Sequence, residues 1–284
     1  MKLMRMINGI LALSLGVLCS AQTTSVNAAS AQGEWFQGNN TAVRLIVSTR
    51  KGSGLVLAGI EIGLDPGWKT YWRNPGDSGG VPPVVDWAGS ENLTIGNLMF
   101  PAPHRIADGA GDGVGYKGSV LFPTRMQKID PKKPAKLVAS IMYGVCSDIC
   151  IPVETKLELK VPADGEEAAE VSGRLAAAVA AVPGPAIKGG PVEVGRPSIE
   201  MAEEGPAITI HVRYPKGSTA RDLFVETLDQ SFLPQPKQVA QAGDDTTFQI
   251  GLAKFKDREK LKDMPVVFTA VSDKGSAEAK LKLP

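Results

Sequence analysis

Cys146 and Cys150 are the residues of this chain whose type and spacing are best suited to chemistry. They lie four positions apart, with Gly144 before them and Pro152 after them. Two thiols this close in sequence can form a redox pair, a structural disulfide or part of a metal site. A disulfide between them would close a short ring, whose stabilising effect lies near the low end of about 2–4 kcal/mol. Such a ring is better suited to opening and closing by thiolate exchange, so the spacing favours a redox pair while leaving the other two sites open.

The overall composition argues against several other kinds of chemistry. The 284 residues include 31 Lys and Arg against 30 Asp and Glu, a net charge of +1. This balance lacks the basic excess of a nucleic-acid-binding protein, so no nucleic acid partner is expected. Two histidines in the whole chain leave little for metal binding or histidine-based catalysis. Thiol exchange needs no cofactor, and we expect neither a cofactor nor a bound metal.

The first 31 residues have the three-part pattern of a secretory signal peptide. Lys2 and Arg5 precede an apolar run over residues 7–18, and small residues follow as far as Ala31. The run is shorter than the ~20 residues that cross a bilayer, so no stable membrane insertion is expected.

Cleavage of this segment would leave two cysteines in the mature chain. Cys19 would leave with the signal peptide, and Leu18 before it does not suit a lipoprotein cleavage site, which requires a small residue. Export would bring Cys146 and Cys150 into an oxidising compartment, where a lone thiol pair is normally a disulfide or a redox couple.

Short strands dominate the pattern on both sides of the cysteines. Apolar and polar residues alternate over 42–48 and 55–62, with a glycine-containing turn between them, which predicts a hairpin. Further strands are expected at 68–72, 84–87, 93–100, 119–122, 135–143 and 155–161. Because no helical periodicity intervenes, an antiparallel sandwich is predicted. The strands flanking the cysteines predict a bend that brings the two Cα atoms within about 7 Å.

A helix and a second β region follow. Acidic residues open the segment 165–182, alanines and leucine fill it, and Pro183 ends it, which predicts a helix. A boundary is expected at Gly189. Beyond it, strands are predicted at 207–212, 223–226, 247–252 and 266–272.

The cysteine run and several other segments together resemble a known family. The run from Tyr143 to Lys156 reads YGVCSDICIPVETK, and the run from Gly67 to Gly79 reads GWKTYWRNPGDSG. Between them lie PAP at 101–103, GYKG at 115–118 and LFP at 121–123. In this order, over 35–162, the segments resemble the N-terminal periplasmic domain of the DsbD family of thiol:disulfide interchange proteins, and the related ScsB-type reductases even more closely.

The resemblance implies an immunoglobulin-like sandwich whose cysteine pair passes electrons in the periplasm. In that pattern Cys150 forms the mixed disulfide with a partner and Cys146 resolves it. The implied partners are thioredoxin-like periplasmic proteins, including those of cytochrome c biogenesis, and a membrane electron transporter. DsbD and ScsB continue into a multi-helix membrane segment and a thioredoxin domain, which the given sequence does not contain, so we expect either that a separate protein supplies the electrons or that the pair is used differently.

The family pattern also places a cap loop over the cysteines, at about 106–114 in this chain. The loop lacks the aromatic residue that covers the sulfur atoms in DsbD. Tyr71 and Tyr116 are expected to line the site, the alternative being that they belong to the sandwich core.

These observations lead to one prediction for the fold and one for the function. We expect an all-β chain with a signal peptide at 1–31, a redox sandwich at 35–163, a helical linker at 164–189 and a second immunoglobulin-like sandwich at 190–284. The function expected is periplasmic thiol–disulfide exchange through Cys146 and Cys150. The alternatives are a copper-tolerance protein that binds copper through the same thiols, as ScsB relatives suggest, and a non-catalytic interaction module with a structural disulfide.

Overall fold

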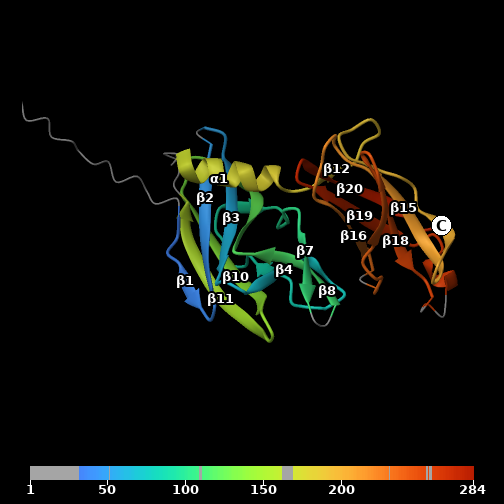
Figure 1. The fold of residues 1–284 in the computed structure, drawn as a ribbon. Coiled ribbons are helices and arrows are strands. Elements are labelled where there is room, and N and C mark those ends of the chain that lie inside the picture. Colours follow the sequence, from blue (N-terminus) through green and yellow to red (C-terminus); the bar gives the residue numbers. More distant parts are fainter. Residues whose placement is uncertain are drawn as a thin grey trace, which may run out of the picture.

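The described part of the chain folds into two β-sandwiches that lie side by side, and within it one α-helix runs along the first sandwich (Figure 1). The computed structural model describes residues 32–50, 52–108, 111–161, 169–229, 231–253, 255 and 258–284. The expected signal peptide, including Cys19, lies outside the described residues. The all-β, immunoglobulin-like class predicted from the sequence is confirmed.

The N-terminal sandwich consists of two antiparallel sheets built from β1 to β11. The first sheet has the order β1 (Phe36–Gly38), β2 (Thr41–Thr49), β3 (Leu55–Leu64), β9 (Ser119–Lys128) and β6 (Leu93–Ile95). The second has the order β11 (Cys150–Val161), β10 (Ala135–Cys146), β4 (Lys69–Gly76), β8 (Gly111–Lys117) and β7 (His104–Asp108), and β5 (Val84–Asp86) also pairs with β10. The cysteine segment therefore belongs to the second sheet.

Alternating side chains explain why these segments form a sandwich. Along β2, Val43, Leu45 and Val47 point into the core, and along β10 the same holds for Tyr143 and Val145. Successive residues of a strand point to opposite faces of its sheet. The residues next to Tyr143 and Val145, among them Cys146, therefore lie on the outer face of the second sheet.

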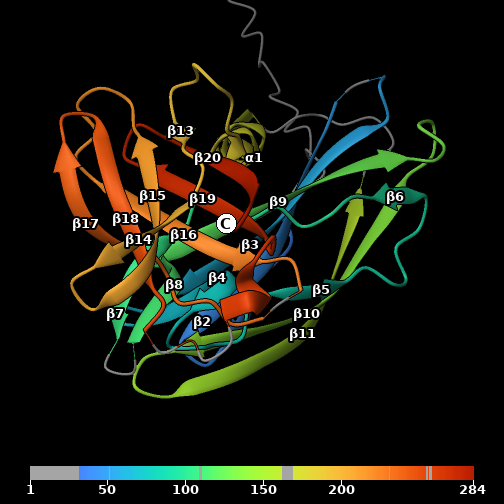
Figure 2. The same ribbon diagram turned by 90° about the vertical axis from the view of Figure 1, so that its right-hand side faces the viewer.

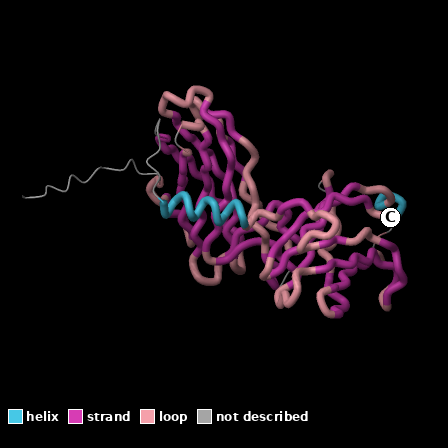
Figure 3. The backbone as a smooth tube through the Cα atoms, turned by 90° about the horizontal axis from the view of Figure 1, so that it is seen from above, coloured by secondary structure: helices cyan, strands magenta, loops and turns pink. Residues whose placement is uncertain are grey.

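The helix expected as a linker packs against the first sheet. It is α1 (Ala169–Ala180), drawn in cyan in Figure 3, and its buried residues Val171 and Leu175 contact Ile46. Leu57 and Leu121 complete this small apolar cluster. The helix covers the outer face of the sheet that carries β2, β3 and β9, so it is an integral part of the N-terminal sandwich.

The C-terminal sandwich also has two sheets, and it faces the viewer in Figure 2. One has the order β12 (Gly184–Pro185), β20 (Gly275–Lys282), β19 (Pro265–Ser272) and β16 (Arg221–Thr227). The other has the order β13 (Glu193–Val194), β15 (Gly205–Arg213), β18 (Asp245–Gly251) and β17 (Lys237–Ala242), with β14 (Ser198–Ala202) also on β15. A short 3₁₀ helix, η1 (Arg258–Leu261), precedes β19. Because β12 pairs with β20, strand pairing in this sandwich begins at Gly184, before the boundary expected at Gly189.

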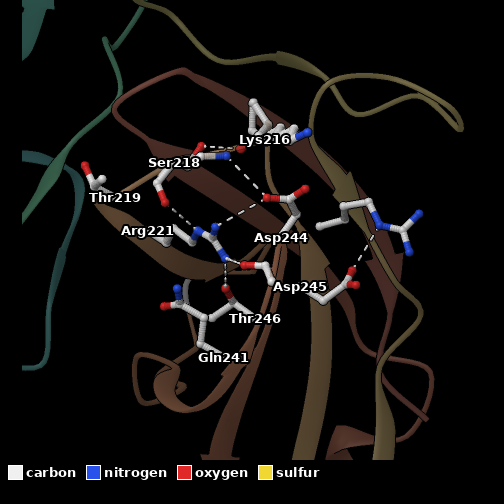
Figure 4. A network of polar contacts seen from close by, with 12 residues as sticks. Lys216, Ser218, Thr219, Arg221, Gln241, Asp244, Asp245 and Thr246 are labelled. Carbon is white, nitrogen blue, oxygen red and sulfur yellow. Dashed lines mark hydrogen bonds and ion pairs between the residues drawn. The ribbon is translucent and has the colours of Figure 1, made fainter.

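A buried arginine joins the loops at one end of the C-terminal sandwich (Figure 4). The Arg221 guanidinium donates hydrogen bonds to the Ser218 carbonyl at 3.1 Å and the Thr246 hydroxyl at 3.2 Å, and lies 3.8 Å from Asp244. Asp244 also accepts from the backbone N–H of Gly217. The network ties the loop before β16 to the β17–β18 turn, which gives it a structural role.

The two sandwiches meet through ion pairs and one shared aromatic contact. Arg73, on β4, donates to both carboxylate oxygens of Glu226 at 2.9 Å and to Glu278 at 2.6 Å. Burial alone would lower the pKa of Arg73, but its bonds to these two carboxylates outweigh that effect and raise the pKa. Phe224 packs into the core of the N-terminal sandwich, 6.0 Å from Trp72 between ring centroids. The interface therefore combines charge pairing with apolar packing.

Candidate functional site

The cysteine pair closes the tip of the β10–β11 hairpin. Cys146 and Cys150 are directly opposite each other in the strand register, with Cα atoms 4.1 Å apart, and their sulfur atoms form a disulfide of 2.09 Å. Within the three-residue connection, the Ser147 N–H donates to the Ile149 carbonyl at 3.0 Å. The bend between two strands that the sequence predicts is confirmed.

The two cysteines differ in their exposure to solvent. Cys146 is only 1% exposed, whereas Cys150 is exposed at the hairpin tip beside Ile149, which is 64% exposed. A protein partner can therefore approach Cys150 directly, while Cys146 lies beneath the surface.

Tyr71 lies against the exposed sulfur. Its hydroxyl is 3.7 Å from the Sγ of Cys150, and the residue as a whole is 2% exposed. β4 reaches this position because Lys69 pairs with Cys146 across the strands and the Thr70 hydroxyl donates to the Gly144 carbonyl at 2.9 Å. The structure thus brings Tyr71 together with the cysteine pair.

Tyr116 lies on the other face of the same sheet. Thr70 pairs with Tyr116 and Tyr71 pairs with Gly115, so the side chains of Tyr71 and Tyr116 point in opposite directions. The Tyr116 hydroxyl donates to the Pro101 carbonyl at 2.8 Å, and its ring packs edge-on against Phe122. Burial raises the pKa of Tyr116 well above its usual value. These contacts place Tyr116 in the sandwich core.

A glycine-containing segment lies over the outer face of β4 and β10. This covering segment, residues 77–83, follows β4 directly. The Val81 carbonyl accepts a hydrogen bond from the Gly144 N–H at 2.9 Å. Gly80 lies so close to the Tyr71 ring that an added Cβ would stand 2.4 Å from its Cζ. The segment therefore buries Tyr71 beside the disulfide.

The expected cap loop at 106–114 forms a hairpin from β7 and β8, with residues 109 and 110 outside the described part. The hairpin contacts the covering segment: the Asp112 carbonyl accepts from the backbone N–H groups of Asp77 at 2.9 Å and Ser78 at 3.4 Å. Gly111 and Gly113 also lie against Asp77 and Ser78. The hairpin thus supports the covering segment from the side.

Three residues of this site were not singled out from the sequence: Lys69, Asp77 and Gly80. Lys69 is buried at 6% exposure and neighbours Cys146 across the strands. Asp77 and Gly80 stand in the run NPGDSGG, a pattern typical of an ordinary turn. The one available signal was the position of all three in or just after the GWKTYWRNPG segment that carries the resemblance.

This geometry can be compared with known proteins. Residues 41–162 match the family model described as thiol:disulfide interchange protein DsbD, N-terminal. The match covers the N-terminal sandwich from β2 through β11 and confirms the resemblance inferred from the sequence. No curated protein sequence matches the chain.

A solved structure has a similar fold over both sandwiches. It is the N-terminal periplasmic domain of ScsB from Proteus mirabilis, with a TM-score of 0.68 and 21% sequence identity. The alignment covers 89% of this chain and 98% of that one. The two proteins therefore share the fold of the N-terminal and the C-terminal sandwich.

Two further observations concern the described part of the chain alone. Within it, no helix has the length and apolar character needed to cross a membrane. Among the same residues, no group of three or more His, Cys, Asp and Glu side chains is arranged to hold a metal ion.

Proposed function

We propose that this protein exchanges thiols and disulfides with periplasmic partners through the Cys146–Cys150 pair. The observation that carries the proposal is a disulfide at an exposed hairpin tip, with one cysteine exposed and the other buried. The DsbD N-terminal match and the likeness to a periplasmic ScsB domain support it.

The exposure of the two sulfurs supports a division of roles. In the reduced protein, the Cys150 thiolate attacks one sulfur of a partner's disulfide, forming a mixed disulfide and releasing the partner's first thiolate. The Cys146 thiolate then attacks the Cys150 sulfur, which restores the Cys146–Cys150 disulfide and releases the partner's second thiolate. Two electrons pass to the partner, and the two released thiolates take up protons. The same steps in reverse reduce the Cys146–Cys150 disulfide again, with two electrons from a dithiol donor.

The expected partners are thioredoxin-like periplasmic proteins on one side of this exchange and a membrane electron transporter on the other. The shape of the site supports a protein partner, because the exposed Cys150 stands on a protruding hairpin beside the exposed side chain of Ile149. A hairpin tip of this kind can enter the active-site groove of a partner and present one sulfur to it.

A trapping experiment tests the proposal. Cys146→Ala removes the resolving thiol, so mixed disulfides formed through Cys150 should accumulate and be released by dithiothreitol. Cys150→Ala is the matched control and should trap far less, because its remaining thiol is buried. A Cys146→Ala protein that forms no mixed disulfide with thioredoxin-like proteins would contradict the proposal.

The reduction potential of the pair provides a second test. The reduction potential of an exchange protein should be near those of its partners, whereas a structural disulfide has a reduction potential below about −300 mV. Equilibration with glutathione or dithiothreitol buffers measures this value, and a result far below that limit would favour the non-catalytic module.

A further inference from the structure

We propose that the C-terminal sandwich holds the covering segment closed over the cysteine site, with Asp77 as the positioning residue that connects them. The inference rests on the proposed exchange function and assigns a role in it to the second sandwich. Asp77 contacts neither sulfur in the structure, so it acts through the segment that it anchors.

The covering segment contacts the site at two points. Gly80 lies on the ring of Tyr71, whose hydroxyl is 3.7 Å from the Sγ of Cys150. The Val81 carbonyl accepts from Gly144, two residues before Cys146. A displacement of this segment would therefore uncover Tyr71 and the outer face of β10 next to the buried sulfur.

The other end of the covering segment is bound to the C-terminal sandwich. The Oδ1 of Asp77 accepts a hydrogen bond from the backbone N–H of Gln235 at 3.0 Å. Gln235 is itself fixed, because its side-chain amide bonds both the N–H and the carbonyl of Val225, at 3.0 and 2.9 Å. The Asn74 amide, three residues before Asp77, donates to the same carbonyl at 3.0 Å. The Asp77–Gln235 hydrogen bond, the anchor of the covering segment, therefore joins this segment to a part of the C-terminal sandwich that is itself held by hydrogen bonds.

Glycines and open space allow the segment to move if the anchor is released. Gly76, Gly79 and Gly80 have φ angles of 83°, 73° and 147°, in the region where glycine meets least steric resistance. A cleft of about 790 Å³ lies between the segment and the C-terminal sandwich, with Gly80, Pro82, Leu228 and Phe232 in its lining. The segment can move into this cleft without displacing packed side chains of the N-terminal core.

Substitution of Asp77 in the full chain tests the anchor. Asp77→Ala removes the acceptor, and alkylation of the buried Cys146 by iodoacetamide, measured after reduction of the disulfide, should accelerate about three- to tenfold, the effect of losing one hydrogen bond. Asp77→Asn keeps an acceptor oxygen, so its rates should stay close to those of the native chain.

A matched control separates the anchor from general loosening of the interface. Glu278→Ala removes one of the two carboxylates that Arg73 binds across the same interface, at 2.6 Å, while Arg73 keeps Glu226. Its rates should remain native. Equal rates in Asp77→Ala and the native chain, or an equal increase in Glu278→Ala, would overturn the proposal.

Two additions keep the test decisive. If Asp77→Ala does not fold, as judged by circular dichroism, Gln235→Ala weakens the same anchor from the other sandwich and should raise the same rates; unchanged rates there would overturn the proposal. The reaction rates of small reagents measure access to the cysteine site, whether or not a protein partner exists. Failure of the anchor can therefore be distinguished from failure of the exchange function, which the trapping experiment measures.

Discussion

The hydroxyl of Tyr71 lies 3.7 Å from the Sγ of Cys150, so the accessible sulfur has a hydrogen-bond donor beside it. In the reduced protein this O–H can donate to the Cys150 thiolate, and hydrogen bonding to the charged form favours that form. The contact links the covering segment, which packs on Tyr71, to the reactivity of the pair.

Tyr71→Phe should slow alkylation of the Cys150 thiol at neutral pH, because the reactive thiolate loses a hydrogen-bond donor. The rate of reaction with iodoacetamide in the Cys146→Ala background measures the effect. Tyr116→Phe is the matched control, since its hydroxyl binds the Pro101 carbonyl on the opposite face of the sheet. An equal change in both variants, or none in Tyr71→Phe, would contradict a role of the hydroxyl at the sulfur.

Lys69→Met should slow alkylation of the Cys146 thiol at neutral pH, because Lys69 is the buried cross-strand neighbour of Cys146 and a nearby cation favours the reactive thiolate. The rate of reaction with iodoacetamide in the Cys150→Ala background measures the effect. Lys117→Met provides the comparison, because Lys117 pairs with Lys69 on the side away from Cys146 and is exposed. If Lys117→Met slows alkylation equally, the effect belongs to overall charge and not to Lys69.

Gly80→Ala should force the covering segment away from Tyr71, since the new Cβ would stand 2.4 Å from the ring. Alkylation of the buried Cys146 in the reduced protein should then become faster. Gly79→Ala shares the positive φ, but its Cβ would meet no atom within 4 Å. It should cost about 1–2 kcal/mol of stability and leave the alkylation rate unchanged. Native alkylation rates in Gly80→Ala would show that the segment does not limit access to Cys146.

Asp77→Asn should change how stability depends on pH. Burial is the largest influence on the Asp77 carboxyl and raises its pKa above the ordinary 3.8. The folded state therefore binds this proton more tightly than the unfolded state, and the native chain loses stability as the pH rises from 3.8 through the raised pKa. The variant lacks this loss, so its stability relative to the native chain should increase across that window and then level off. Urea unfolding at a series of pH values measures the difference, and a constant difference would refute the assignment.

Arg73→Met should lower the free energy of unfolding by about 2–4 kcal/mol, because it leaves Glu226 and Glu278 without their shared cation in a partly buried interface. Arg213→Met removes an ion pair to Asp245 in which both side chains are more than half exposed, and should cost at most about 1 kcal/mol. Urea denaturation compares the two. Equal costs would mean that the interdomain pair contributes no more than a surface pair.

The hairpin that carries the cysteines was predictable because its signals are local. Strand-like runs lie on both sides of Cys146 and Cys150, and the short spacer between them permits only a tight connection. The face of the sheet on which each tyrosine lies was not predictable. Tyr71 and Tyr116 occupy different strands, and the register of β4 on β8 decides which side chain reaches the outer face.

The role of the covering segment could not be predicted from the sequence, for a related reason. Asp77 bonds a backbone group 158 positions away, and no local pattern around NPGDSGG indicates that partner. The glycines around β8 likewise favour a loop, although residues on both sides of the tip pair into a hairpin. The helix after β11 was found from its alanines and leucine, but only tertiary packing shows that it covers the first sheet.

The position of Phe224 in the core of the N-terminal sandwich affects how the protein can be divided. A fragment cut at residue 162, where the DsbD-type match ends, would keep the disulfide hairpin but lose Phe224 and α1. Ile46, fully buried in the whole chain, would lose the cover of α1, and Trp72 would lose its contact with Phe224. The segment matched by the family model is thus smaller than the unit whose core is packed, and studies of the cysteine chemistry call for both sandwiches in one polypeptide.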